Sequence, residues 1–143
     1  MYEPGISNKL TDRRVLILYP RAQTRNVYLA GLLADYGDQL IYYRLTDDIN
    51  SWQEWAGALV DHLTTALDGF KTDAAGQIKS GPDKAAGTLA ESLSSYFSGK
   101  SHAKTEYMLY IDEIDRIEQD NAFTTFVHTL INGLPANLKI AFN

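Results

Sequence analysis

Short apolar segments separated by stretches of helical pattern constrain the fold of this chain more than any other feature. Apolar runs of this length are typical of strands that are buried on both faces, as in parallel sheets. Segments with apolar residues at helical spacing connect them, and strands that alternate with helices predict a parallel sheet. We therefore expect a three-layer α/β domain with a parallel sheet and helices on both faces. The expected strands are 15–19, 40–45, 107–111 and 138–142.

Helices are expected between these strands, and local signals fix several of their ends. Ser51 and Glu54 form a capping-box pattern at a helix start. Asp120 or the residue after it can cap the last helix, and Gly37 supplies the end of the first. Residues 69–83 contain several glycines and a proline and predict a loop. The expected helices cover 27–36, 51–67, 84–97 and 120–134.

Composition argues against several classes of function. The 143 residues are enough for one domain with a sizeable core. A formal net charge of −5 argues against direct binding of nucleic acid or an anionic membrane. Cysteine is absent and the three histidines are far apart, so no zinc site is expected. No apolar run is long enough to cross a membrane, and residues 1–12 are too polar for a signal peptide, so we expect a cytoplasmic protein.

The segment 107–115, YMLYIDEID, carries the chemical signal of the sequence. An apolar strand that ends in Asp-Glu is the Walker B pattern, because a parallel strand delivers its carboxyl end to the edge where ligands bind. In this pattern Asp112 holds Mg²⁺ and Glu113 polarises the attacking water as the catalytic base. The same residues also suit a solvated turn, in which Asp112 or Asp115 caps the next short helix or the acids pair with Arg116.

The succession from 107 to 143 is a strand, an acidic turn, an amphipathic helix, Leu-Pro and a strand. It resembles the NTPase domain of STAND proteins (signal-transduction ATPases with numerous domains), which include large bacterial regulators related to the maltose activator and other LuxR-type regulators. The resemblance implies a P-loop-NTPase-like sheet with strand order 2-3-4-1 and places Asn143 at the sensor-1 position. It also implies that residues 1–143 are one domain, the N-terminal fragment of a larger multidomain protein, cut before the family's fifth strand.

The Walker A pattern of a phosphate-binding loop, expected after the first strand, is absent there. A Walker A loop, G-x-x-x-x-G-K-[ST], needs glycines so that backbone N–H groups surround the phosphates, and a lysine to neutralise their charge. Residues 19–28 contain neither glycine nor lysine. If the following helix sets the register, Asn26 takes the lysine position. Arg21 and Arg25 are then the candidates to pair with phosphate.

These observations favour a divergent, catalytically impaired STAND-type domain that acts as a scaffold or self-association module of a bacterial signalling or transcriptional regulator. The resemblance implies downstream domains of the same protein as partners and leaves a homo-oligomer open. No cofactor is expected, and ATP with Mg²⁺ stays an option. One alternative is an active ATPase whose loop arginines replace the lysine while Asp112, Glu113 and Asn143 keep their roles. The other is a receiver-like or Rossmann-like binding module, which needs a 2-1-3 strand arrangement.

Aromatic and acidic residues around the start of the second helix allow two interpretations. Tyr42, Tyr43, Trp52 and Trp55 suit packing between helix and sheet better than a platform for stacking bases. Asp47 and its acidic neighbour could bind a cation, but turn chemistry explains them more simply.

Overall fold

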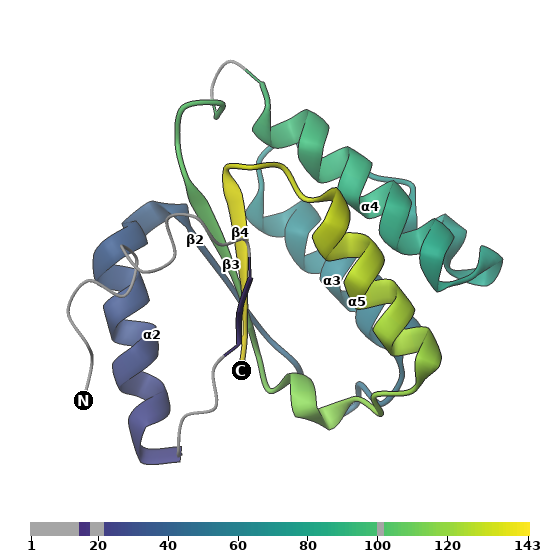
Figure 1. Cartoon of the computed structure of the whole chain (residues 1–143), viewed down its shortest axis with the longest axis horizontal. Coiled ribbons are helices and arrows are strands. Elements are labelled where there is room, and N and C mark those ends of the chain that lie inside the picture. The colour runs from purple at the N-terminus through teal and green to yellow at the C-terminus, as the bar shows by residue number, and fades with distance from the viewer. Residues whose placement is uncertain (1–14, 18–21, 100–101) are drawn as a thin grey trace.

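The computed structural model describes residues 15–17, 22–99 and 102–143, with side chains from Leu29 onward (Figure 1). Four strands alternate with helices along the chain. The strands are β1 (Val15–Ile17), β2 (Leu40–Arg44), β3 (Tyr107–Asp112) and β4 (Leu138–Phe142). The α-helices are α2 (Ala22–Tyr36), α3 (Trp52–Ala66), α4 (Pro82–Phe97) and α5 (Asn121–Gly133). Short 3₁₀ segments are η1 (Gly37–Gln39), η2 (Ala74–Ser80) and η3 (Ile114–Arg116).

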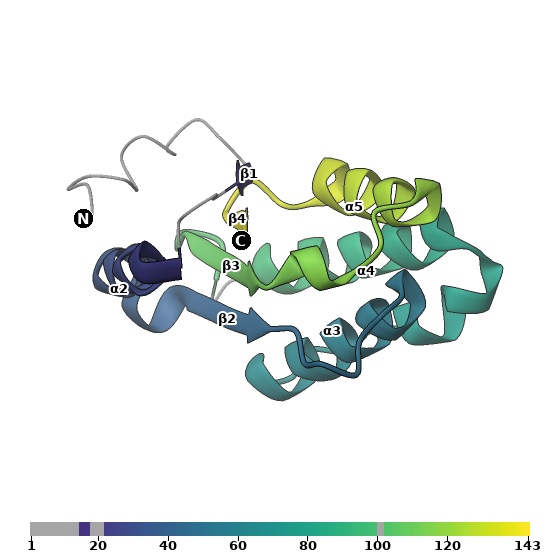
Figure 2. The same cartoon turned by 90° about the horizontal axis from the view of Figure 1, so that it is seen from below.

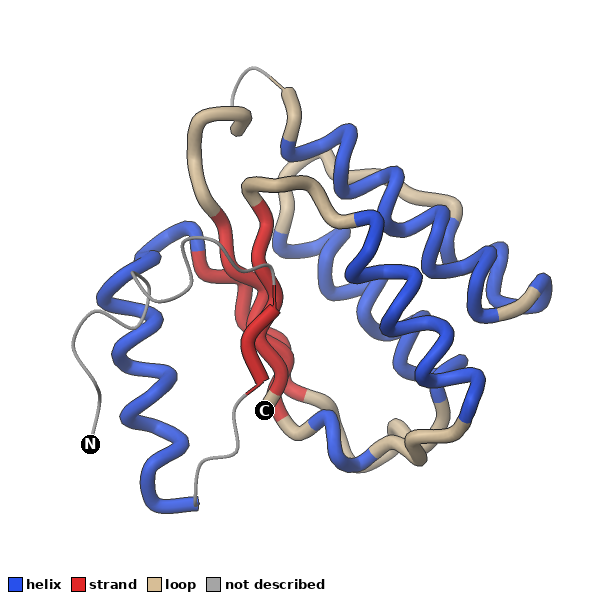
Figure 3. Tube along the Cα trace, in the orientation of Figure 1, coloured by secondary structure: helices blue, strands red, loops and turns tan. Residues whose placement is uncertain are grey.

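The described strands form one parallel sheet in the order β1-β4-β3-β2. The expected α/β architecture with a parallel sheet is therefore confirmed. In the sheet register Arg44, the last residue of β2, lies beside Asp112, the last residue of β3. All four strands run in the same direction, so their carboxyl ends meet at one edge of the sheet, the edge marked C in Figure 3.

Helices cover both faces of the sheet, as the sequence predicts. Figures 1 and 2 show α2 on one face and α3, α4 and α5 together on the other. Connections between parallel strands are right-handed, so the direction in which a connection crosses the sheet decides which face its helix covers. The connection from β1 to β2 crosses the sheet in one direction, whereas the connections from β2 to β3 and from β3 to β4 return in the other. None of the described helices combines the length and the apolar character needed to cross a membrane.

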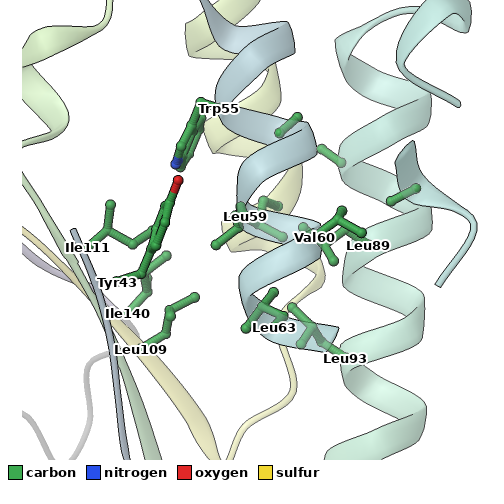
Figure 4. Close-up of a cluster of buried hydrophobic side chains, with 14 of the residues drawn as sticks. Tyr43, Trp55, Leu59, Val60, Leu63, Leu89, Leu93, Leu109, Ile111 and Ile140 are labelled. Atoms are coloured by element: carbon green, nitrogen blue, oxygen red, sulfur yellow. The ribbon is translucent and has the colours of Figure 1, made fainter. Parts of the chain in front are cut away.

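Two apolar cores hold these layers together. In the larger one, Leu59, Val60 and Leu63 of α3 lie between the sheet and α4 (Figure 4). The smaller core lies between the sheet and α2. Its buried members are Leu32, Tyr36, Met108, Tyr110 and Ala141. Burying each leucine side chain contributes about 1.5–3 kcal/mol, so the larger cluster supplies most of the apolar stabilisation.

The predicted helix caps are confirmed. The hydroxyl of Ser51 accepts a 3.2 Å hydrogen bond from the backbone N–H of Glu54, and the Glu54 carboxylate accepts from the N–H of Asn50 at 3.4 Å. At the start of α5, the carboxylate of Asp120 accepts a 2.8 Å bond from the N–H of Phe123. The bonds to the N–H groups of Glu54 and Phe123 satisfy backbone donors that have no partner within their own helix.

Three segments differ from the expected ones by more than a single residue at one end. Helix α2 begins at Ala22 rather than at residue 27, because Ala22 and the residues after it favour a helix and no glycine or proline interrupts them. Helix α4 begins at Pro82, whose fixed φ suits a first helical turn. The predicted loop 69–83 contains η2, where Ile78 packs against the larger core and anchors the segment.

The pair α4 and α5 is packed unusually closely. A Cβ added at Gly133 of α5 would lie 2.6 Å from the Cβ of Ala90 in α4. The hydroxyl of Ser94 in α4 donates a 3.1 Å hydrogen bond to the carbonyl oxygen of Gly133. Glycine at position 133 therefore sets the separation of these two helices.

Candidate functional site

The candidate site lies at the carboxyl edge of the sheet, where the apolar strand β3 ends in Asp112 and Glu113. Asp112 is the last residue of β3 and only 3% exposed. Glu113 has a left-handed backbone with φ 63°, the one non-glycine residue with positive φ in the described part of the chain. This conformation costs a residue with a Cβ about 1–2 kcal/mol. It ends the strand and directs the chain into η3.

Both oxygens of the Asp112 carboxylate accept hydrogen bonds from side chains of neighbouring strands. The hydroxyl of Tyr42 in β2 donates to Oδ2 at 2.8 Å. The amide Nδ2 of Asn143, directly after β4, donates to Oδ1 at 2.8 Å. Burial and this hydrogen bond to Asp112 raise the pKa of Tyr42 to about 12. Tyr42 therefore stays protonated and acts as a donor to the carboxylate at neutral pH.

The Glu113 carboxylate is paired with two arginines. Arg44 binds Oε2 through its Nε, and Arg116 binds Oε1 through Nη2 at 3.2 Å. Arg116 also pairs with Asp47, whose Oδ1 lies 2.7 Å from Nη1 of the arginine. The hydrogen bond from Arg44, with a smaller contribution from Arg116, lowers the pKa of Glu113 below its ordinary value. The Glu113 side chain is 12% exposed, whereas that of Arg44 is 60% exposed, so the carboxylate is shielded from water and its first partner is not.

Backbone hydrogen bonds continue the sheet ladder into the loops of the site. The N–H of Leu45 donates to the Asp112 carbonyl at 3.1 Å, and the N–H of Asn143 donates to the Ile111 carbonyl at 2.9 Å. The N–H of Ile114 then donates to the Asn143 carbonyl at 3.0 Å. The polar side chains of the site thus stand on backbone that the sheet itself holds in place.

The structure brings together some of the residues that the sequence singled out. Asp112, Glu113 and Asn143 lie together at the carboxyl end of the sheet. Arg21 lies outside the described residues. Arg25 and Asn26 are described by their helical backbone alone.

The register that placed Asn26 at the end of a phosphate loop is wrong in one respect. It assumed a helix start at residue 27, whereas α2 begins at Ala22. Asn26 therefore stands inside the helix, and only residues 18–21 separate β1 from α2. Phosphate contacts by Arg21, Arg25 or Asn26 stay predictions.

Sequence reasoning missed Tyr42 and Arg44 as parts of the site, whereas the expected pairing of the acids with Arg116 is confirmed for Glu113. Tyr42 packs against the smaller core, as expected, on the other face of β2 from Tyr43, and its hydroxyl also bonds to Asp112. The signal that could have found Arg44 is positional: both it and Asp112 end strands that the expected order makes neighbours. The packing interpretation is confirmed for Tyr43, Trp52 and Trp55, which are all buried.

Asp47 and Asp48 serve the turn after β2. The hydroxyl of Thr46 donates to the Asp48 carboxylate, and Asn50 donates from Nδ2 to the Asp48 carbonyl at 3.3 Å. The hydrogen bond from Thr46 lowers the pKa of Asp48. Across the described ranges, no three His, Cys, Asp or Glu side chains gather closely enough to hold a metal ion.

Comparison with known proteins gives no family for the chain. No protein-family model matches it, and no curated protein matches it significantly.

Proposed function

We propose that this chain is a divergent, catalytically impaired STAND-type NTPase domain that serves as a scaffold in a bacterial signalling or transcriptional regulator. The observation that carries the proposal is the double ion pair of Glu113 with Arg44 and Arg116. The residue at the position of the catalytic base is engaged by the chain's own cations. Both oxygens of its carboxylate are held by arginines, which opposes the transfer of a proton to it from water.

The lowered pKa of Glu113 supports the same conclusion. A general base works best when its pKa lies near the pH at which the enzyme operates. Two guanidinium groups act in the opposite direction, because they stabilise the ionised carboxylate and make it a weaker proton acceptor. This arrangement suits a structural ion pair.

The phosphate side of the site supports impairment as well. Residues 19–28 contain neither glycine nor lysine, and helix α2 takes up the chain from Ala22. A Walker A loop needs glycine dihedrals and lysine charge to hold a nucleotide's phosphates. Without them, tight nucleotide binding has little physical support.

The strand order supports a P-loop-like class over the receiver-like or Rossmann-like alternative. Counted from the β2 edge the order is 2-3-4-1, and β1 and β2 stand at opposite edges of the described sheet. The alternative needs the second strand beside the first. In the proposed scaffold, downstream domains of the same protein and a second copy are the expected partners.

The proposal is tested by calorimetric titration of ATP and ADP into the chain, with and without Mg²⁺. We expect no heat of binding at millimolar nucleotide. Binding tighter than roughly 100 µM, about −5.5 kcal/mol, that Arg25→Ala weakens would overturn the proposal. An Arg25→Lys variant, which keeps the charge, is the matched control for that loss.

An active ATPase is the second candidate, and one observation favours it. The Asn143 amide contacts Asp112 at 2.8 Å, and this contact supports the assignment of the two residues to neighbouring sensor-1 and Walker B positions. Steady-state phosphate release separates the two candidates. Turnover that Glu113→Gln abolishes and Glu118→Gln leaves intact would establish the enzyme, whereas equal background in all three proteins supports the scaffold.

A further inference from the structure

We propose that Arg44 and Arg116 are internal counter-cations of the acidic pair Asp112 and Glu113, so that this strand end works without a divalent metal ion. The inference deepens the proposed function, because it rests on the assignment of these acids to the Walker B position. It concerns the metal alone and can be tested without nucleotide.

The first support is the state of the Asp112 carboxylate. Mg²⁺ requires near-octahedral oxygen ligands and keeps several of its waters. Asp112 is 3% exposed, and its oxygens accept bonds from Tyr42 and Asn143, each at 2.8 Å. A metal ion or its water would have to share a nearly fully buried oxygen with a hydroxyl or an amide that already bonds to it. Burial and these two donors therefore make Asp112 a poor ligand for Mg²⁺.

The second support is the charge around Glu113. Arg44 and Arg116 both bind its carboxylate, and Arg116 also pairs with Asp47. Two guanidinium groups bring the same charge of +2 that one Mg²⁺ would bring to the same edge. A cation that approached Glu113 would meet these groups and be repelled by them.

The third support is geometric. Arginine presents a planar fork of fixed donors, which is pre-organised for carboxylates in a way that a lysine ammonium is not. Arg44 comes from the end of β2 and Arg116 from η3, so the Glu113 carboxylate is held from two different elements. The positive charge is therefore part of the fold.

The test measures binding of Mn²⁺, used alone as the probe, by the electron paramagnetic resonance signal of the free ion. The proteins are the wild-type chain, Arg44→Gln/Arg116→Gln, and the same double variant with Glu113→Gln added. The matched control is Lys79→Gln/Lys84→Gln, which removes the same charge from exposed positions in η2 and α4.

We expect the double arginine variant to bind Mn²⁺ at least roughly tenfold more tightly than the wild type, because the repelling charge is removed. Adding Glu113→Gln should abolish the gain, and the lysine control should show less than a twofold change. Circular dichroism shows whether each variant is folded. If the double variant fails to fold, the single variants Arg44→Gln and Arg116→Gln must each show a gain.

Two results would overturn the inference. One is Mn²⁺ binding by the wild type tighter than about 1 mM that Glu113→Gln removes, since the acids would then form a metal site as they stand. The other is a folded arginine variant, double or single, with no gain over the wild type. ATP binding without Mn²⁺ involvement would contradict the proposed function but leave this inference standing, so the two failures are distinguishable.

Discussion

The hydroxyl of Tyr42 donates a 2.8 Å hydrogen bond to the buried carboxylate of Asp112, on the neighbouring strand. The next residue, Tyr43, points to the opposite face of the sheet. Its buried hydroxyl has no hydrogen-bond partner among the described residues and faces the indole nitrogen of Trp55, which has none among them either (Figure 4). The hydroxyl groups of these two adjacent tyrosines therefore differ: that of Tyr42 forms a hydrogen bond to a carboxylate, and that of Tyr43 does not.

We expect Tyr42→Phe to lower the free energy of unfolding by about 1.5–3 kcal/mol, because a hydrogen bond to a charged group is lost. Tyr43→Phe should be neutral or slightly stabilising, since it removes a buried hydroxyl that lacks a partner. Urea unfolding of both variants at pH 7 measures the difference. Equal losses in the two variants would contradict the assignment of Tyr42 to the site.

The ion pairs of Glu113 predict a dependence of stability on acid pH. Arg44 and Arg116 lower the pKa of Glu113 in the folded state below its ordinary value of 4.5. The resulting stabilisation is present above pH 4.5 and is lost as the pH falls through the lower folded-state pKa. Glu113→Gln removes this contribution. The stability difference between wild type and variant should therefore be largest near neutral pH and shrink below pH 4.5.

Urea unfolding of the two proteins at a series of pH values checks this prediction. Glu118→Gln, which changes an exposed carboxylate of the same loop, is the control. A difference that stays constant, or grows, as the pH falls below 4.5 would mean that Glu113 is not held ionised by its arginines.

The close approach of α4 and α5 predicts opposite effects for two glycines that line the same shallow groove, Gly133 and Gly87. Gly133→Ala should destabilise by about 1–3 kcal/mol, because its Cβ would lie 2.6 Å from the Cβ of Ala90. Gly87→Ala should stabilise by about 0.5–1 kcal/mol, because it stands inside α4 and no atom lies within 4 Å of the added Cβ. Thermal unfolding of both variants decides, and a shift of the same sign in both would refute the packing argument.

One side chain holds the loop between α4 and β3. The Nδ2 of Asn137 lies 2.9–3.1 Å from the carbonyl oxygens of Phe97, His102 and Thr105. Asn137→Ala should cost about 1–3 kcal/mol, because partly buried carbonyl groups lose their donor. Asn132→Ala, at an exposed position of α5, should change stability by less than about 0.5 kcal/mol. Chemical unfolding measures both, and faster amide exchange across 102–106 in the first variant would locate the effect.

Features that depend on neighbouring residues could be predicted from the sequence. The strand 107–111, the capping box at Ser51 and the cap at Asp120 all correspond to elements of the structure, because each signal and its partner lie within a few residues. The meeting of Asp112 with Asn143 also follows, once the strands that carry them are taken to be parallel neighbours.

Features that depend on residues far apart in the sequence could not be predicted from the sequence. Tyr42 and Asp112 are 70 positions apart, and no local pattern distinguishes a tyrosine that packs from one that donates to a carboxylate. The pairing of Glu113 with Arg44 depends in the same way on sheet register. The 3₁₀ segment η2 was missed because Ile78, which anchors it, is a single apolar residue among glycines and polar residues.

The division of the molecule into two cores has a spectroscopic consequence. Both tryptophans of the chain belong to the larger core, where Trp52 and Trp55 contact the ring of Phe126 with centroids 5.8 and 5.1 Å apart. Indole emission therefore reports on the interface of α3 with α5, whereas the core under α2 contributes only tyrosine. Far-ultraviolet circular dichroism records helices on both faces. If the unfolding curves from the two signals coincide, α2 unfolds together with the rest of the domain. If the dichroism changes before the emission is lost, α2 unfolds first.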